Sequence, residues 1–133
     1  MNNFVFENST KVYLGEGCVK EYLSNILSSY GDTVMLCYGG GSIKKNGIYD
    51  EIISVLKKEN KTVVEFSGIP SNPTYSKVLE GVKLAKESKA DLILAVGGGS
   101  VMDCCKAISL GAKYGGDIWA DFWARPGVID FEP

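Results

Sequence analysis

The fold class follows from one segment of the sequence, Leu92-Ile93-Leu94-Ala95-Val96-Gly97-Gly98-Gly99-Ser100-Val101-Met102-Asp103. Its first five residues form an unbroken apolar run, which is typical of a strand buried on both faces. Three glycines follow directly, and the next apolar residues recur at helical spacing, at Val101, Cys104, Cys105 and Ile108. The stretch therefore predicts a buried strand, a tight turn and a helix with one apolar face.

The same alternation occupies the preceding part of the chain. Apolar runs at residues 33–38 and 62–66 predict two more buried strands. Helical spacing predicts helices over residues 19–30 and 48–56, and a third that begins at Pro73 with Asn72 as its N-cap. Strands that alternate with helices predict an α/β fold with a doubly wound parallel sheet, which is a Rossmann-like nucleotide-binding architecture.

The two ends of the chain depart from this pattern. Residues 4–6 and 11–14 flank a polar turn and predict an N-terminal β-hairpin. After Gly116 the periodicity ends, although four aromatic residues follow, namely Trp119, Phe122, Trp123 and Phe131. We therefore expect an α/β domain over residues 1–116 and a tail over residues 117–133 that packs on another part of the protein.

Composition and charge narrow the classes of function. The 133 residues are 45% hydrophobic and 23% charged, as in ordinary soluble domains. A net charge of −2 argues against a nucleic-acid partner, which usually requires a clustered basic excess. The apolar runs are too short to span a membrane, and the N-terminus lacks the pattern of a signal peptide. We therefore expect a cytoplasmic protein without nucleic-acid or membrane partners.

The sequence contains no histidine, which excludes a histidine base or a histidine-ligated metal within these residues. The cysteines Cys18, Cys37, Cys104 and Cys105 have no CxxC spacing, so we expect small, reduced core residues. A nucleophilic cysteine is the alternative, and it would have no imidazole partner. We expect neither a catalytic residue nor a metal site in this chain.

The turn at Gly97, Gly98 and Gly99 carries the strongest chemical signal. Glycines between a strand and a helix let the backbone N–H groups at the helix N-terminus approach a phosphate closely. Ser100, Asp103 and Lys106 share one stripe of that helix, on the side away from its apolar face. These features predict a pyrophosphate site. The alternative is a turn whose glycines serve packing alone.

A second triple glycine follows the apolar run at residues 33–38. It reads Tyr38-Gly39-Gly40-Gly41-Ser42-Ile43-Lys44-Lys45. An acidic residue at such a strand end would accept a hydrogen bond from a ribose 2′-OH and repel a 2′-phosphate. Glycine, Ser42 and two lysines do the reverse, so the pattern favours NADP over NAD. The lysines could instead form a solvated helix start.

These motifs resemble the N-terminal domain of iron-containing (group III) alcohol dehydrogenases, in order and over nearly the whole chain. The similarity is greatest to the NADPH-dependent butanol dehydrogenase branch, and dehydroquinate synthases and glycerol dehydrogenases carry related glycine turns. The matching segments are residues 2–4, 14–17, 38–47, 68–73 and 95–106. The resemblance implies an enzyme that interconverts aldehydes and primary alcohols with NADP(H).

The resemblance also implies which residues contact the cofactor. In this family the residues matching Gly98, Gly99 and Ser100 hold the pyrophosphate, and the Asp matching Asp103 lies near the nicotinamide. The Asn matching Asn72 contacts the cofactor. The turn matching Gly39, Gly40 and Ser42 surrounds the adenosine ribose and its 2′-phosphate.

The family's divalent iron, which polarises the carbonyl, is held by one Asp and three His on a helical C-terminal domain. A chain without histidine cannot supply that set. We therefore expect the cofactor-binding half of a larger, homodimeric enzyme, inactive by itself, with residues 117–133 leading to the metal domain. The alternatives are a stand-alone nucleotide-binding module and a metal-free half enzyme that a separate partner chain completes.

Overall fold

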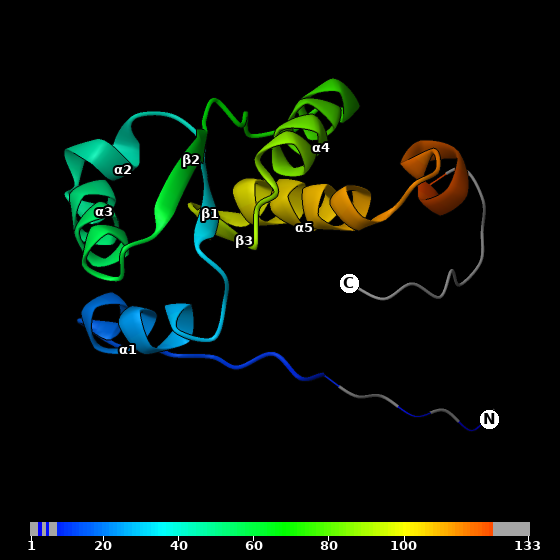
Figure 1. Ribbon diagram of the computed structural model, residues 1–133. Helices are drawn as coiled ribbons and strands as arrows, with labels where there is room; N and C mark the ends of the chain where they lie inside the picture. The colour runs from blue at the N-terminus through cyan, green and yellow to red at the C-terminus, as the bar shows by residue number, and fades with distance from the viewer. Residues whose placement is uncertain (1–2, 4, 6–7, 124–133) are drawn as a thin grey trace.

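The computed structural model describes residues 3, 5 and 8–123, with residues 122 and 123 described by their backbone alone. Five α-helices, three strands and one short π-helix occupy this part of the chain (Figure 1). In chain order they are α1 (Cys18–Leu27), β1 (Thr33–Tyr38), α2 (Ser42–Lys45), α3 (Ile48–Lys58), β2 (Thr62–Phe66), α4 (Tyr75–Ser88), β3 (Leu92–Val96), α5 (Gly99–Lys113) and η1 (Trp119–Trp123).

The three strands form one parallel sheet in the order β2-β1-β3. The strands occupy the three apolar runs of the sequence, so the prediction of a parallel sheet is confirmed. The central strand β1 pairs Thr33 with Thr62 of β2 and Tyr38 with Val96 of β3. The last residues of β1 and β3 therefore lie side by side at the carboxyl edge of the sheet.

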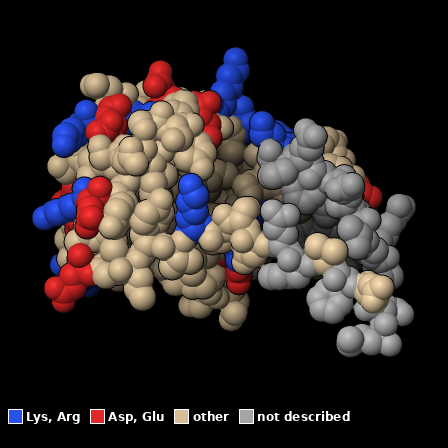
Figure 2. All heavy atoms as spheres, turned by 90° about the horizontal axis from the view of Figure 1, so that it is seen from below, with Lys and Arg blue, Asp and Glu red and all other residues tan. Residues whose placement is uncertain are grey.

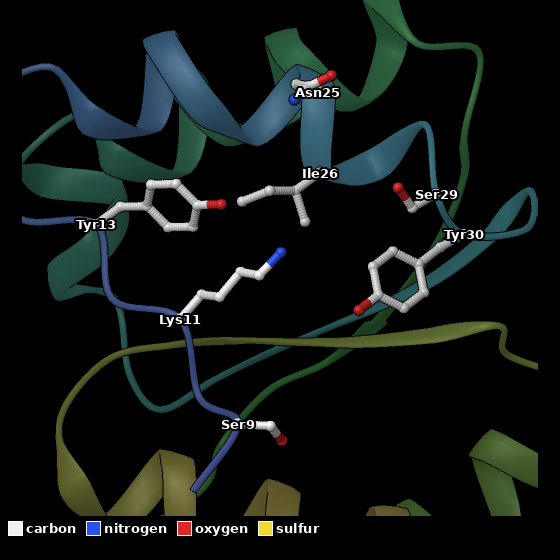
Figure 3. Close-up of a pocket in the computed structure, with 7 residues that line it drawn as sticks. All are labelled: Ser9, Lys11, Tyr13, Asn25, Ile26, Ser29 and Tyr30. Carbon is white, nitrogen blue, oxygen red and sulfur yellow. The ribbon is translucent and has the colours of Figure 1, made fainter.

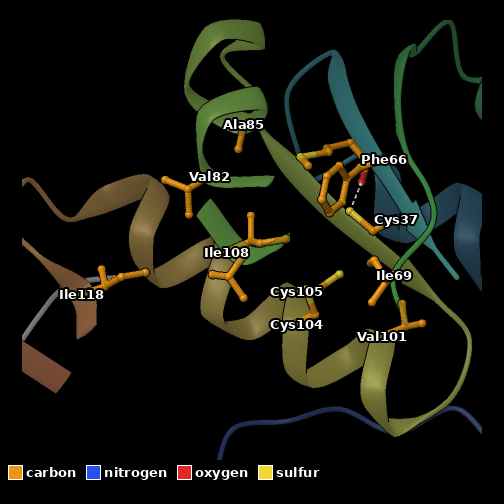
Figure 4. Close-up of a cluster of buried hydrophobic side chains, with 12 residues drawn as sticks. Cys37, Phe66, Ile69, Val82, Ala85, Val101, Cys104, Cys105, Ile108 and Ile118 are labelled. Atoms are coloured by element: carbon orange, nitrogen blue, oxygen red, sulfur yellow. Dashed lines mark hydrogen bonds between the residues drawn. The ribbon is translucent and has the colours of Figure 1, made fainter. Parts of the chain in front are cut away.

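Helices cover both faces of the sheet, as expected for a doubly wound fold (Figure 1). Met35 and Cys37 of β1 pack with α4 and α5 in one buried cluster, part of which Figure 4 shows. Val34 and Leu36, which alternate with them, pack with α1 and α3 in the other. Full burial of such side chains contributes about 1.5–3 kcal/mol each, so β1 anchors both layers.

The helix α4 begins two residues later than its sequence predicts. Thr74 is its N-cap, and its side-chain oxygen accepts a hydrogen bond from the backbone N–H of Lys77 at 3.2 Å. The prediction of Asn72 as N-cap and Pro73 as first helical residue is wrong. Thr74 has the extended backbone of an N-cap, and its hydroxyl oxygen reaches a backbone N–H of the helix. It therefore caps α4 in place of Asn72.

The N-terminal segment does not form the second strand of the expected hairpin. Residues 8–14 have no strand pairing, and the side chains of Val12 and Leu14 are 80% and 95% exposed. Tyr13 instead stacks on Tyr22 of α1, with ring centroids 4.7 Å apart. The prediction of a strand over residues 11–14 is wrong, because no described layer covers its apolar residues. Residues 4 and 6, in the other expected strand, lie outside the described part.

The chain after α5 turns back onto the helices. Ile118 is buried in the cluster that contains Val82, and the ring of Trp119 lies 5.5 Å from that of Tyr75. The side chains of Phe122 and Trp123, and all of Phe131, lie outside the described part. The domain boundary at residue 116 stays a prediction.

Charged side chains of both signs lie on the surface of the protein. Figure 2 shows basic and acidic side chains interspersed on the face seen from below. In the described part of the chain, no helix has the length and apolar character needed to span a bilayer.

Candidate functional site

The two glycine turns leave the sheet at neighbouring points. Tyr38 and Val96 are register partners, so Gly39 and Gly97, which follow them, start from the same edge. The chain then passes to α2 and α3 on one face of the sheet and to α5 on the other (Figure 1). Parallel α/β folds bind ligands at such a point, where successive connections diverge to opposite faces.

The first glycine of each turn is required by the fold. Gly97 has a φ of +152°, and a Cβ added to it would lie 2.9 Å from a methyl carbon of Val101. A Cβ on Gly39 would lie 3.0 Å from the carbonyl oxygen of Ile69. Neither position accepts a side chain without movement of its neighbours, so both glycines have a structural explanation.

The other four glycines of the two turns have no such explanation. A Cβ built on any of Gly40, Gly41, Gly98 or Gly99 would meet no atom within 4 Å, and none of the four has a left-handed φ. Packing alone therefore accounts for Gly39 and Gly97 but not for these four. Bare backbone that faces open space can approach a ligand to hydrogen-bonding distance, which a side chain would prevent.

The N-terminus of α5 is suited to an anion. Gly98 is its N-cap and provides no side-chain hydrogen bond, and the first turn holds no acidic residue. The first backbone N–H groups of a helix have no acceptor within it, and they point outward from its positive end. Because α5 is 15 residues long, its dipole is well developed at Gly99. A phosphate here would receive both hydrogen bonds and a favourable field.

The loop between β2 and α4 joins the two turns. The backbone N–H of Gly68 donates to the carbonyl oxygen of Gly39 at 2.8 Å, and the hydroxyl of Ser100 donates to the carbonyl oxygen of Ser71. Asn72, exposed and next to Ser71, is thereby held in a loop fixed to both turns. The structure brings Asn72, the Gly39 turn and the Gly97 turn to the same edge of the sheet.

Two further predicted residues lie on the exposed sides of their helices. Asp103 forms an ion pair with Lys106 at 3.5 Å, and both side chains are more than three-quarters exposed. This contact confirms that the two residues share one stripe of α5. Ser42 is the first residue of α2 and is exposed beside the Gly39 turn.

The cysteines belong to the core. Cys37, Cys104 and Cys105 are all buried in the cluster that Figure 4 shows. Contact with Cys105 and burial raise the pKa of Cys37, and burial raises the pKa of Cys104. Both thiols therefore stay protonated at neutral pH, which argues against a nucleophilic role for these two. The hydrogen bond with Cys37 lowers the pKa of Cys105, which is also buried in the core. The prediction of core residues is confirmed for these three, whereas Cys18 is only partly buried. Their reduced state stays a prediction.

The iron site implied by the resemblance does not fit this chain. Within the described residues no group of three His, Cys, Asp or Glu side chains comes together to hold a metal ion. The whole sequence contains no histidine. No catalytic step through a metal is therefore assigned to the described residues.

Sequence reasoning did not predict the pockets of the structure, two of which lie beside α1. One, of about 520 Å³, lies between the N-terminal segment and the end of α1, where Lys11 extends between Tyr13 and Tyr30 (Figure 3). Tyr30 comes before β1, so this pocket lies away from the glycine turns. The other, about 320 Å³ and largely apolar, is lined by residues of α1, α3 and β3 and by Gly97. Residues distant in sequence line both pockets, so no local motif indicates either.

Comparison with known proteins identifies the family. The family model for iron-containing alcohol dehydrogenase matches residues 9–130. The chain is 52% identical over 119 residues to probable NADH-dependent butanol dehydrogenase 1 of Bacillus subtilis, covering 90% of this chain and 30% of that protein. It is 40% identical over 114 residues to NADPH-dependent aldehyde reductase YqhD of Escherichia coli, covering 86% and 28%.

A solved structure shares the fold. The crystal structure of NADH-dependent butanol dehydrogenase A from Thermotoga maritima matches with a TM-score of 0.82 and 47% identity, covering 92% of this chain and 31% of that one. The chain thus spans about a third of the length of its relatives. Over that third, sequence and fold agree: the chain belongs to the iron-containing alcohol dehydrogenase family.

Proposed function

We propose that this chain is the cofactor-binding part of an alcohol dehydrogenase that interconverts aldehydes and primary alcohols, and that it binds NADP(H). One observation carries the proposal. Gly40, Gly41, Gly98 and Gly99 face open space at the carboxyl edge of the sheet, where neither packing nor backbone conformation requires glycine. A dinucleotide that lies across both turns explains all four.

Each turn suits a different part of that cofactor. The turn that enters α5 offers backbone N–H groups and a helix dipole to the pyrophosphate, through Gly98, Gly99 and Ser100. The turn after β1 offers uncharged backbone and the hydroxyl of Ser42 to the adenosine ribose. Asn72 would contact the cofactor from the loop between them, and Asp103, one helical turn further along α5, would lie toward the nicotinamide.

The preference for NADP(H) rests on charge. The turn from Gly39 to Ser42 contains no acidic side chain to repel a 2′-phosphate, and Lys44 and Lys45 follow it. The names of the relatives do not decide the form of the cofactor, because they mention both NADH and NADPH. The proposal therefore depends on the turn itself.

Catalysis is assigned to the whole protein. The metal, when bound, supplies a Lewis acid that polarises the substrate carbonyl. Its ligands would come from outside the described residues, with residues 117–133 leading toward a helical metal domain. The described residues bind and orient the cofactor. We do not expect turnover by this chain alone. The homodimeric state of the whole protein stays a prediction, which light scattering can test.

Calorimetric titration with NADPH and NADH tests the proposal. The chain should bind both, with NADPH the tighter ligand. Gly40→Asp adds a carboxylate in open space and should weaken NADPH by about 1.5–3 kcal/mol, the scale of one charge-assisted contact, with less effect on NADH. Gly115→Asp makes the same charge change in open space at the far end of α5 and serves as the control.

The outcomes separate the two levels of the proposal. Failure of the unmodified chain to bind either cofactor would contradict cofactor binding at the turns. Equal affinities, unchanged in Gly40→Asp, would leave binding intact and overturn the preference for NADP(H).

A further inference from the structure

Lys44, one of the two lysines that follow the Gly39 turn, belongs to a cluster of four side chains whose other three members have no role in the site described above. Tyr38 is the last residue of β1, Lys44 lies in α2, Tyr49 in α3 and Glu65 in β2. The two tyrosine rings meet edge to face, with centroids 5.8 Å apart and planes at 68°. The Nζ of Lys44 lies 5.6 Å from the centroid of Tyr38 and 4.8 Å from that of Tyr49.

Glu65 holds this ring pair in place. The hydroxyl of Tyr38 donates to Oε1 of Glu65 at 3.5 Å, and the hydroxyl of Tyr49 donates to the same oxygen. That second hydrogen bond raises the pKa of Tyr49 to about 12, so its ring stays neutral over the physiological range. Glu65 therefore holds both aromatic rings in place near the ammonium group of Lys44.

The two aromatic rings restrict the ammonium group of Lys44 without neutralising its positive charge. A cation over an aromatic ring is attracted to it by about 0.5–1 kcal/mol at an exposed site, while the ring carries no net charge. In the described part of the chain no carboxylate forms an ion pair with Lys44. Lys45, the next residue, is exposed and has neither a ring contact nor an ion pair with any described residue.

The location of Lys44 places its positive charge beside the proposed ribose turn. Tyr38 directly precedes Gly39, so the ring that supports Lys44 belongs to the strand end from which the ribose turn starts. Lys44 is exposed on its other side and can still donate hydrogen bonds there. An ammonium group restricted beforehand loses less side-chain entropy when it contacts an anion than a freely moving one does.

We propose that Lys44, positioned by Tyr38, Tyr49 and Glu65, contacts the 2′-phosphate of NADPH and determines the preference of the site for that cofactor. This inference rests on the proposed function, because it assumes that the ribose lies at the Gly39 turn. It distinguishes Lys44 from Lys45, which have the same charge and lie on the same short helix. Lys44 is the specificity residue, and Tyr49 and Glu65 are positioning residues.

The test compares NADPH with NADH, and 2′,5′-ADP with 5′-AMP, in calorimetric titrations of the full chain. The members of each pair differ by the 2′-phosphate. Lys44→Met should weaken NADPH and 2′,5′-ADP about tenfold, the effect of losing one charge-assisted contact, and leave NADH and 5′-AMP within about twofold. Lys45→Met, the matched control, should change all four by less than about twofold.

Tyr49→Leu removes the supporting ring but keeps the charge. It should weaken NADPH by about threefold without affecting NADH, since Lys44 must then be ordered on binding. A purely structural role of Tyr49 would weaken both cofactors alike. Circular dichroism of each variant confirms that the fold is retained.

Two results would overturn the inference while leaving the proposed function standing. One is an unmodified chain that binds both cofactors, with Lys44→Met weakening them equally or not at all. The other is a larger effect of Lys45→Met than of Lys44→Met on NADPH. Absence of binding by the unmodified chain would contradict the proposed function and this inference together.

Discussion

The two triple-glycine turns have the same composition but lead into helices of very different length. The turn at Gly97 leads into α5, a helix of 15 residues. The turn at Gly39 leads into α2, a helix of four residues that ends with Asn46 as its C-cap. A helix of one turn develops little dipole. We therefore propose that the Gly97 turn binds an anion through its backbone, whereas the Gly39 turn would depend on side chains such as Lys44.

The two turns share a structural feature that their identical glycine runs do not show. In each, the first glycine is fixed by a close neighbour, and the second and third face open space. Each run of glycines thus combines one position that the fold requires with two that the fold does not require, and we propose that these two serve the cofactor. Substitutions that separate the two kinds of position test this view.

The largest effect on stability should come from Gly97→Ala. Its φ of +152° and the 2.9 Å approach to Val101 both oppose a side chain. Strain of this kind costs about 1–3 kcal/mol, which urea denaturation can measure. Gly39→Ala should cost less, on the order of 1 kcal/mol, because one carbonyl oxygen must shift. An unchanged urea midpoint for Gly97→Ala would show that the fold does not require glycine at position 97.

A smaller effect is expected at the loop that connects the turns. Thr74→Ala removes the N-cap of α4 and should lower the free energy of unfolding by about 1 kcal/mol. Asn72→Ala should lower it by less than about 0.5 kcal/mol, because Asn72 is exposed and does not cap the helix. Thermal or urea unfolding measures both. Equal losses would indicate that Asn72 shares the capping role.

The smallest effect concerns pH and belongs to the Gly39 turn. The pKa of Tyr49 is raised to about 12 by its hydrogen bond to Glu65. A raised folded-state pKa means that the bond stabilises the fold at pH values below the ordinary tyrosine pKa of 10, and that this contribution is lost as pH rises through about 12.

Glu65→Gln should bring the pKa of Tyr49 closer to its ordinary value. The near-ultraviolet absorbance of the phenolate measures this, with Tyr49→Phe to assign the signal. An identical titration curve for Glu65→Gln would show that the carboxylate does not hold the ring.

The strands were predictable because each is an unbroken apolar run, and such runs are buried on both faces of a parallel sheet. Helix boundaries were harder to predict. Asn72 and Thr74 are both good caps, and only the backbone conformation decides between them. The expected strand at residues 11–14 failed because apolar residues there have no partner layer, which the local sequence does not reveal.

The site was predictable to the level of its two turns. Which glycine of each turn is structural depends on Val101 and on the carbonyl of Ile69, and neither dependence is visible in three identical letters. The cluster around Lys44 was missed in part because Glu65 belongs to a different strand from Tyr38. Parallel pairing brings the two strands together, and no local spacing in the sequence records it.

We propose that glycine at the N-terminus of α5 serves a ligand and not the fold. The most direct test is Gly99→Ala, measured for both unfolding and NADPH affinity. Alanine in this helical position should raise the free energy of unfolding by about 0.4–1 kcal/mol, because its Cβ meets no neighbour. The same Cβ should block the phosphate and weaken NADPH about tenfold or more. A stabilised chain with reduced affinity is the predicted result, and a stabilised chain with unchanged affinity would contradict the claim.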